Sequence, residues 1–189
     1  MAATASHVMP LGTPLPHFRL RDTEGNIVAS EDFADADALL VVFMCNHCPF
    51  VRNISAQLAS FAREFMPRGM AVVGINSNDA ERYPDDSFEA MGWEKARVGY
   101  PFPYLYDVDQ TAAHAFGAVC TPDFFLFDGD GYLAYHGQFD GSRPGNNVSV
   151  SGDDLRAAAT AVLTGIEVDP EQAPSAGCSI KWKPGNEPE

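Results

Sequence analysis

Hydrophobic residues recur along the chain with periods that change from strand-like to helix-like at definite points. Residues 39–44 (LLVVFM) form an unbroken apolar run, which is typical of a strand buried on both faces of a sheet. Residues 49–65 carry apolar side chains at spacings of three and four, which predicts an amphipathic helix after that strand. Upstream, rough alternation over residues 17–30, with a turn at 22–26, predicts a β-hairpin.

The rest of the pattern alternates strands with helices. Asp86 begins a capping-box sequence that opens one predicted helix, while Ser151 caps the last helix and Gly165 stops it. The remaining expected elements are strands at 70–75, 102–106, 123–127 and 132–136, and helices at 86–98, 110–116 and 151–163. This order predicts an α/β fold with a central mixed sheet, helices on both faces and an N-terminal β-hairpin extension.

One domain accounts for most of the chain. At 189 residues the protein is long enough for one domain with a substantial core and short for two. Residues 1–16 indicate an irregular arm, and we assign residues 1–165 to the α/β domain. Residues 166–189 contain four prolines and no periodicity, so we expect an irregular C-terminal tail that packs on the domain or trails from it.

Charge and composition narrow the classes of partner. Lys and Arg number 12 against 26 Asp and Glu, and the net charge of −14 disfavours nucleic acid and anionic membranes, which require clustered cations. No apolar run reaches the ~18 residues of a membrane-spanning helix. The N-terminus also lacks the basic and long apolar regions of a secretory signal. We therefore expect a cytoplasmic location, where closely spaced cysteines indicate redox or metal chemistry.

The residue best placed for chemistry is Cys48, which lies where the predicted strand at 39–44 gives way to its helix. Pro49 suits the first helical position, because the backbone N–H that it lacks would have no partner there, and Cys48 is then the N-cap. Free amide groups and the positive end of the helix dipole favour the thiolate, which is the nucleophilic form. His47 and Arg52 can add positive charge nearby.

Three further cysteines, Cys45, Cys120 and Cys178, are candidates for the thiol that reacts with Cys48. In an extended chain Cys45 would lie about 10 Å from Cys48, which is too far for a disulfide. A bridge between them therefore requires the chain to turn directly after the strand, and Asn46 permits such a turn.

The second cysteine region surrounds Cys120. Pro122 stands just before the predicted strand at 123–127, where a proline is a candidate for a cis peptide bond. The main chemical alternative is a zinc site built from Cys45, His47, Cys48 and Cys120. Two of these ligands are adjacent in the sequence, although structural zinc ligands usually come in separated pairs, so we expect neither a metal nor an organic cofactor.

Together these segments resemble the thioredoxin-fold superfamily, specifically its alkyl-hydroperoxide-reductase/thiol-specific-antioxidant (redoxin) branch. The resemblance covers residues 10–165 and includes the N-terminal hairpin, the strand–Cys–helix junction and the Thr121-Pro122 pair before a Phe-rich strand. The run Cys-Asn-His-Cys-Pro-Phe-Val is similar to a peroxiredoxin-like subgroup. The resemblance implies that the Thr-Pro loop packs against the reactive cysteine, presents backbone to the substrate and keeps metal away.

Two departures from the family bear on the chemistry. Aligned without gaps on the family's dithiol motif, Cys48 matches the attacking cysteine, Val51 replaces the resolving one, and Cys45 lies three residues upstream. True peroxiredoxins carry a Pro and a Thr before the reactive cysteine, and here Val41 and Cys45 replace them. The missing hydroxyl disfavours peroxidase activity. The resolving thiol stays open between the preferred Cys45, Cys120, Cys178 and an external thiol.

The sequence therefore predicts a thiol-disulfide oxidoreductase, in which the Cys48 thiolate attacks a disulfide and a second thiol releases the product. The expected partners are a protein or small-molecule disulfide and an external thiol reductant, and members of this branch often form homodimers. One alternative is a thiol peroxidase that reduces hydroperoxides through a sulfenic acid at Cys48. Another alternative is a redox sensor that does not turn over.

Overall fold

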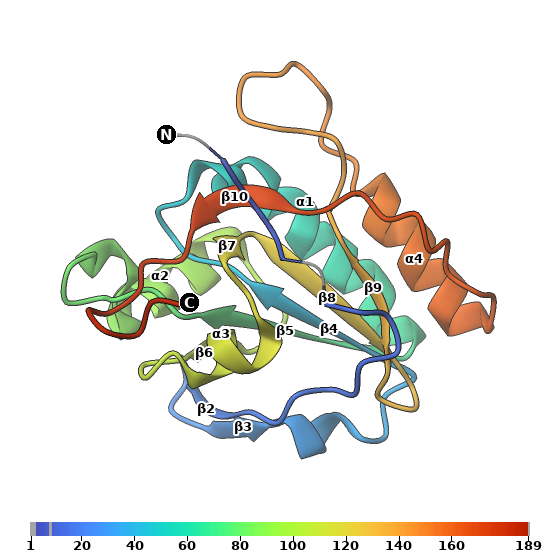
Figure 1. Ribbon diagram of the computed structural model, residues 1–189, viewed down its shortest axis with the longest axis horizontal. Coiled ribbons are helices and arrows are strands. Elements are labelled where there is room, and N and C mark those ends of the chain that lie inside the picture. The colour runs from blue at the N-terminus through green and yellow to red at the C-terminus, as the bar shows by residue number, and fades with distance from the viewer. Residues whose placement is uncertain (1–2, 8, 189) are drawn as a thin grey trace.

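A seven-stranded mixed sheet forms the centre of the protein (Figure 1). The computed structural model describes residues 3–7 and 9–188. The strands of this sheet are β2 (Arg19–Asp22), β3 (Ile27–Ala29), β4 (Ala38–Phe43), β5 (Met70–Asn76), β6 (Tyr104–Tyr106), β8 (Asp123–Asp128) and β9 (Leu133–Gly137). They lie in the order β3-β2-β6-β5-β4-β8-β9, and β2 and β3 form the predicted hairpin.

Strand β4 is inside the sheet because its apolar run leaves no residue for solvent. All of its residues are buried. It pairs in parallel with β5 along one edge and antiparallel with β8 along the other. Because β8 runs the opposite way, it begins where β4 ends, with Asp123 opposite Phe43. The chain that leaves the end of β4 and the chain that enters the start of β8 therefore lie next to each other, at the same end of these two strands.

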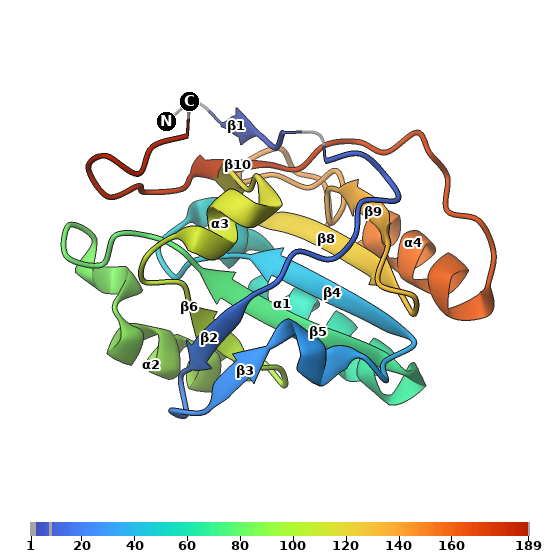
Figure 2. The same cartoon turned by 60° about the horizontal axis from the view of Figure 1, so that its bottom comes forward.

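Helices cover both faces of the sheet, as the alternation predicts (Figure 2). Helices α1 (Pro49–Phe65), α2 (Phe88–Val98) and α4 (Asp153–Thr164) contribute to the core on one face, and α3 (Thr111–Phe116) contributes to the core on the other. Successive residues of β4 belong to the two cores in turn. Three short 3-10 helices are η1 (Ser30–Phe33), η2 (Met66–Arg68) and η3 (Pro84–Asp86).

A second, three-stranded sheet lies over the end of β4 and was not predicted. It consists of β1 (Thr4–Ala5), β10 (Ala176–Ser179) and β7 (Cys120–Thr121), in the order β1-β10-β7. The expectation that the arm at 1–16 and the tail at 166–189 are irregular throughout is wrong at β1 and β10. These strands are too short to show the alternation of apolar and polar residues from which a strand is predicted. The division of the chain at residue 165 itself stays a prediction.

Two helix starts differ from their predictions by one residue. Ser87 is the N-cap of α2 and accepts a hydrogen bond from the Ala90 amide, whereas Asp86 turns into the interior. Gly152, with φ 72°, is the N-cap of α4, where Ser151 was expected. A glycine adopts this left-handed conformation without strain, so the chain can turn sharply into the helix. No helix in the described part of the chain is long and apolar enough to cross a membrane.

Candidate active site

Cys48 lies at the junction that the sequence predicted. Strand β4 ends at Phe43, the chain turns, and α1 begins at Pro49 with Cys48 as its N-cap (φ −66°, ψ 122°). The N-cap carbonyl accepts the first helical bond, from the Arg52 amide at 3.0 Å. Although it stands at a helix terminus, the Cys48 side chain is 0% exposed.

The turn after β4 is held by the buried carboxylate of Asp86. One oxygen accepts a bond from the Asn46 amide at 2.7 Å, and the other lies 2.5 Å from His47 Nδ1 and 2.7 Å from Asn78 Nδ2. Burial opposes ionisation of Asp86, yet its pKa is lowered, because His47, Asn78 and the Asn46 amide all donate to the charged form. Asp86 therefore fixes the loop that carries Cys45 and Cys48.

The His47 side chain is the charged partner in this arrangement. Hydrogen bonding to Asp86 raises the pKa of His47, and burial opposes the shift. The ring stacks on Tyr83, with centroids 5.6 Å apart. Asp86 therefore favours the protonated form of His47, the form that would carry the positive charge predicted beside the loop.

Asn46 and Arg52 act as positioning residues of the same turn. The Asn46 amide group donates to Asp85 O at 2.8 Å, and its side-chain oxygen accepts from Tyr104 Oη at 3.0 Å. Arg52 Nε donates to Asn46 O at 2.8 Å. The guanidinium was expected to add charge near Cys48, but its hydrogen bond is to the loop backbone.

The loop before β8 completes the site from the other side. The Thr121–Pro122 peptide bond is cis, as predicted. Thr121 O lies 3.2 Å from Cys48 Sγ, and Thr121 Oγ1 lies 3.4 Å from Cys45 Sγ. A carbonyl can only accept, so this contact favours the protonated form of Cys48. The predicted packing of the Thr-Pro loop against the cysteines is confirmed by these contacts.

Despite that carbonyl, the pKa of Cys48 is lowered from 9.0 to about 5. The largest cause is hydrogen bonding from the Cys45 thiol, followed, against the opposing effect of burial, by the Cys178 thiol and by the backbone amides of Val51 and Cys178. The helix N-terminus, represented by Val51, contributes less than predicted, and the sulfur forms no capping hydrogen bond. The thiolate is thus favoured chiefly by neighbouring thiols.

The two donor thiols have the opposite tendency. Hydrogen bonding to Cys48 and burial raise the pKa of Cys45, and the Asp86 charge raises it further. Burial and Cys48 raise the pKa of Cys178 to about 12, while Lys181 lowers it. The three sulfurs therefore form one cluster with a single ionised member, and all are free thiols. The sulfurs of Cys45 and Cys48 both lie against Thr121, so the chain makes the turn after β4 that their pairing requires.

Cys120 is close to this cluster but differs from it. Its sulfur lies 4.0 Å from Pro122 O. Burial, with a smaller effect of the Asp123 charge, raises the pKa of Cys120. The geometry thus favours Cys45 and Cys178 over Cys120 as partners of Cys48. The position of Cys178 comes from β10, which the sequence did not predict.

One group of donor atoms could hold a metal ion. Ligand atoms of Cys45, His47 and Asp86 lie within 4.8 Å of one another. This group contains Asp86 in place of Cys48 and Cys120 of the zinc site that was considered as an alternative. However, the oxygens of Asp86 already form hydrogen bonds with His47 and with the amides of Asn46 and Asn78. The group is therefore satisfied by hydrogen bonds, and binding a metal would break them.

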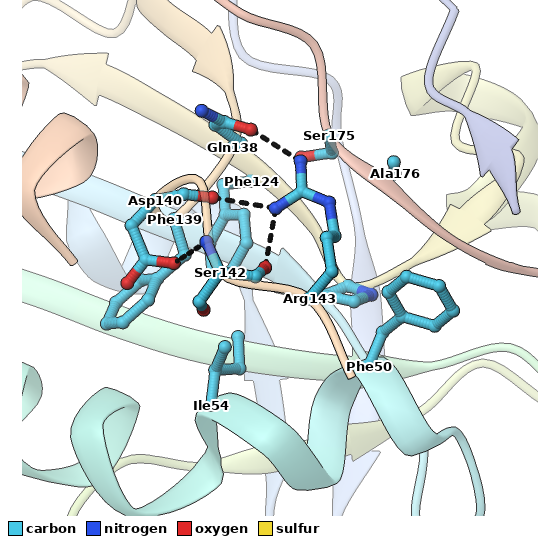
Figure 3. Close-up of a pocket in the computed structure, with 11 residues that line it drawn as sticks. Phe50, Ile54, Phe124, Gln138, Phe139, Asp140, Ser142, Arg143, Ser175 and Ala176 are labelled. Atoms are coloured by element: carbon cyan, nitrogen blue, oxygen red, sulfur yellow. Dashed lines mark hydrogen bonds between the residues drawn. The ribbon is translucent and has the colours of Figure 1, made fainter. Parts of the chain in front are cut away.

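A small hollow of about 20 Å³ lies beside the cluster (Figure 3). Phe50 of α1 and Pro122 line it, together with Ser175 and Ala176 at the start of β10. Its outer wall is Arg143, whose guanidinium donates to the carbonyls of residues 140 and 142 and to the side-chain oxygen of Gln138. A space of this size holds about one water molecule, and the residues that line it do not include Cys48.

Comparison with known proteins places the chain among redox proteins. A sequence model described as the AhpC/TSA family matches residues 11–136. The thiol:disulfide interchange protein DsbE of Escherichia coli (strain K12) is 29% identical over 128 residues, which cover 66% of this chain and 63% of DsbE. The 1-Cys peroxiredoxin B of Oryza sativa subsp. indica is 28% identical over 105 residues, covering 55% of this chain and 47% of that protein.

Solved structures confirm the predicted fold. A hypothetical protein from Sinorhizobium meliloti 1021 is 51% identical with a TM-score of 0.95, covering 96% of this chain and 100% of that chain. A DsbE-like protein from Chlorobium tepidum is 21% identical with a TM-score of 0.65, over 82% of this chain and 99% of that one. The predicted thioredoxin-like α/β fold is therefore correct.

Proposed function

The chain belongs to the AhpC/TSA family, and from this premise we propose that it is a thiol-disulfide oxidoreductase with Cys48 as its nucleophile. The observation that carries the proposal is the position of Cys48, at the N-cap of α1 against the cis Thr121-Pro122 loop, and its pKa is lowered to about 5. A nucleophile that is ionised at neutral pH beside a thiol that is able to replace it has the two parts that disulfide exchange requires.

The proposed reaction has two steps. The Cys48 thiolate attacks one sulfur of a substrate disulfide, the substrate S–S bond breaks, and the other substrate sulfur leaves as a thiolate. A second cysteine of the protein then attacks Cys48 and releases the bound substrate as a thiol, which leaves an internal disulfide. Cys45, the preferred candidate from the sequence, and Cys178 both contact Cys48. An external thiol reductant returns the protein to its reduced form.

The surrounding residues prepare this reaction without taking part in bond exchange. Asp86 and Asn46 hold the turn, and Asp86 raises the pKa of His47, which favours a positive charge near the ionised cysteine. Thr121 and Pro122 close the site from the neighbouring strand. Because the thiolate is the resting form, the nucleophile needs no separate base.

Turnover of a protein disulfide tests the proposal. The reduced wild-type protein should accelerate the reduction of insulin by dithiothreitol, and Cys48→Ser should lower the rate by roughly three orders of magnitude, to the uncatalysed level. The location of the disulfide step at Cys48 fails if Cys48→Ser retains the wild-type rate. In that case the nucleophile is Cys45 or Cys178.

A second activity, hydroperoxide reduction, is favoured by the match to 1-Cys peroxiredoxin B. It would oxidise Cys48 to a sulfenic acid that condenses with a neighbouring thiol. Against it, Cys45 stands where peroxiredoxins carry the threonine hydroxyl. Consumption of hydrogen peroxide coupled to a thioredoxin system distinguishes the two: a rate no faster than that of a free thiol removes the peroxidase.

The partners follow from this chemistry. We propose protein disulfides as substrates, since the relative DsbE is named for thiol:disulfide interchange. A cytoplasmic location and a homodimer also remain proposals. Dimerisation is read directly from the molecular mass in solution.

A further inference from the structure

Strand β10 lies across the start of α1 (Figure 1), and it brings Cys178 beside Cys48. It pairs antiparallel with β7, so that Cys178 stands opposite Thr121, the residue whose carbonyl contacts Cys48. The thiol and the amide of Cys178 both favour the ionised form of Cys48 and lower its pKa. The tail therefore delivers a third redox-capable sulfur to the centre of the site.

The close approach of β10 depends on Gly177. A Cβ atom at this position would lie 1.9 Å from Thr121 O and 2.6 Å from Thr121 C, which no packing tolerates. Both obstacles are backbone atoms, so no side-chain movement relieves the clash. The residue before Cys178 is thus fitted to seat this strand against the loop of the cis proline.

The chain on both sides of β10 is anchored to the domain. Ser175 Oγ donates to Gly137 O at 2.8 Å, and the Lys181 amide donates to Asn78 Oδ1 at 2.8 Å. Asn78 also donates to Asp86, so the tail shares the network that holds the Cys48 turn. Between these anchors, β10 pairs with β1 along one side and with β7 along the other, two residue pairs each. The strand is therefore preorganised at the site, and its pairs with β7 must break if it is to leave Thr121.

Charge distinguishes Cys178 from Cys45 once Cys48 has reacted. In a mixed disulfide Cys48 carries no charge, so its effect on both neighbouring thiols disappears. Cys45 then keeps the opposing carboxylate of Asp86, whereas Cys178 keeps the favourable ammonium group of Lys181. Cys178 is also slightly more exposed, 7% against 1%. It is the thiol that ionises more readily at that stage.

We propose that Cys178 is the resolving cysteine and that β10 is a strap which closes over Cys48 as the two form a disulfide. This inference rests on the proposed function. The Cys48 thiolate and a substrate disulfide R–S–S–R′ first give Cys48–S–S–R and the thiolate R′–S⁻. The Cys178 sulfur then bonds to Cys48, the bond to R breaks, and the Cys178 proton leaves on R–SH. Substrate entry and product exclusion are thereby coupled to the position of one strand.

Disulfide mapping of the wild-type protein tests the proposal without any variant. The reduced protein is treated with glutathione disulfide, remaining thiols are alkylated, and peptides are identified by mass spectrometry. We expect Cys48–Cys178 as the main internal disulfide. A majority of Cys45–Cys48, or a stable glutathione adduct with no internal disulfide, overturns the role of Cys178. Failure of Cys48 to accept glutathione at all contradicts the proposed function instead.

Two cysteine variants separate the steps. Cys178→Ser should accumulate the mixed disulfide of Cys48 with glutathione, whereas Cys45→Ser should still close to an internal disulfide. If Cys178→Ser closes as completely as the wild type and Cys45→Ser accumulates the adduct, Cys45 is the resolving thiol and the inference is wrong. The readout is the mass of the adduct, which does not depend on the rate of the first step.

A glycine pair tests the strap without removing a thiol. Gly177→Ala should force β10 away from Thr121, slow closure at least tenfold and speed alkylation of Cys48 by iodoacetamide. Gly141→Ala is the matched control, because a Cβ there meets nothing within 4 Å. Closure and alkylation at wild-type rates in Gly177→Ala would show that the seating of β10 does not govern access to Cys48.

Discussion

Cys48 and Cys120 are equally buried, both 0% exposed, and each follows or precedes a core strand at the same edge of the sheet. Their acidities nevertheless shift in opposite directions. The pKa of Cys48 is lowered to about 5, and that of Cys120 is raised. Burial alone raises a thiol pKa, so the difference must come from neighbouring groups.

The neighbours differ in what they offer to a negative charge. Four groups favour the charged form of Cys48: the thiols of Cys45 and Cys178, and the backbone amides of Val51 and Cys178. Cys120 faces a carbonyl oxygen and the carboxyl group of Asp123. The comparison teaches that a fully buried cysteine becomes a nucleophile when donors surround it. Substitutions can remove these donors one at a time.

The largest effect on stability is expected from replacing Asp86, the residue that anchors the turn before Cys48. Asp86→Ala leaves the donors on His47, Asn46 and Asn78 without their buried partner, which should lower the free energy of unfolding by about 2–4 kcal/mol. Urea unfolding measures this loss. Asp85→Ala, which removes an exposed neighbouring carboxylate, is the control and should change stability by less than about 0.5 kcal/mol. Equal losses in both would show that Asp86 does not hold the turn.

The second largest effect is expected from Cys45→Ala, which removes the main cause of the low Cys48 pKa. Cys45→Ala deletes the largest donor, and a hydrogen bond to a charged group is worth about 1.5–3 kcal/mol, so the pKa of Cys48 should rise by about one to two pH units. The pH dependence of thiolate absorbance measures it. Cys45→Ser, which keeps a donor, should restore part of the shift. An unchanged Cys48 pKa in Cys45→Ala would refute the donor argument.

A smaller effect is expected from His47 and depends on pH. Asp86 raises the pKa of His47, so the stabilisation from this pair is present below pH ~6.5 and is lost as pH rises through the raised value. His47→Gln should therefore cost more stability at pH 6 than at pH 9, by about 1 kcal/mol or less. Thermal unfolding at the two pH values checks this, with the exposed His114→Gln as control. A loss of stability in His47→Gln that is larger at pH 9 than at pH 6 would contradict a stabilising pair between protonated His47 and Asp86.

The smallest effect should come from replacing Cys120, the cysteine that was compared with Cys48. Cys120→Ala removes a protonated thiol that lies outside the donor set of Cys48, so the rate of exchange with glutathione disulfide should change by about twofold or less. A loss comparable to that of Cys48→Ser would mean that Cys120 takes part in the reaction.

The features that could be predicted from the sequence are those set by residues close together along the chain. The apolar run of β4, the stripe of α1 and Pro49 at its first position together placed Cys48 at the N-cap, and Pro122 indicated the cis bond. The role of Asp86 was missed because its partner loop is 40 residues distant. Its sequence context, before Ser87, fitted a helix cap instead. The sequence around a buried acidic residue with polar neighbours shows no hydrophobic periodicity from which its burial could be predicted.

The tail was beyond prediction for a related reason. Its short strand pairs with residues some sixty positions earlier, and neither β7 nor β10 is long enough to show alternation. The one available signal was a glycine directly before Cys178, which is typical of close backbone approach. The sequence therefore indicated the nucleophile, whereas only the structure identified the thiols that make it acidic.

The most direct test of this account is the pH titration of Cys48 in the reduced protein. Thiolate absorbance is recorded against pH, and the curve of Cys48→Ser is subtracted from that of the wild type. We predict half-ionisation near pH 5. A midpoint near the ordinary value of 9.0 would contradict the claim that donor thiols hold Cys48 ionised.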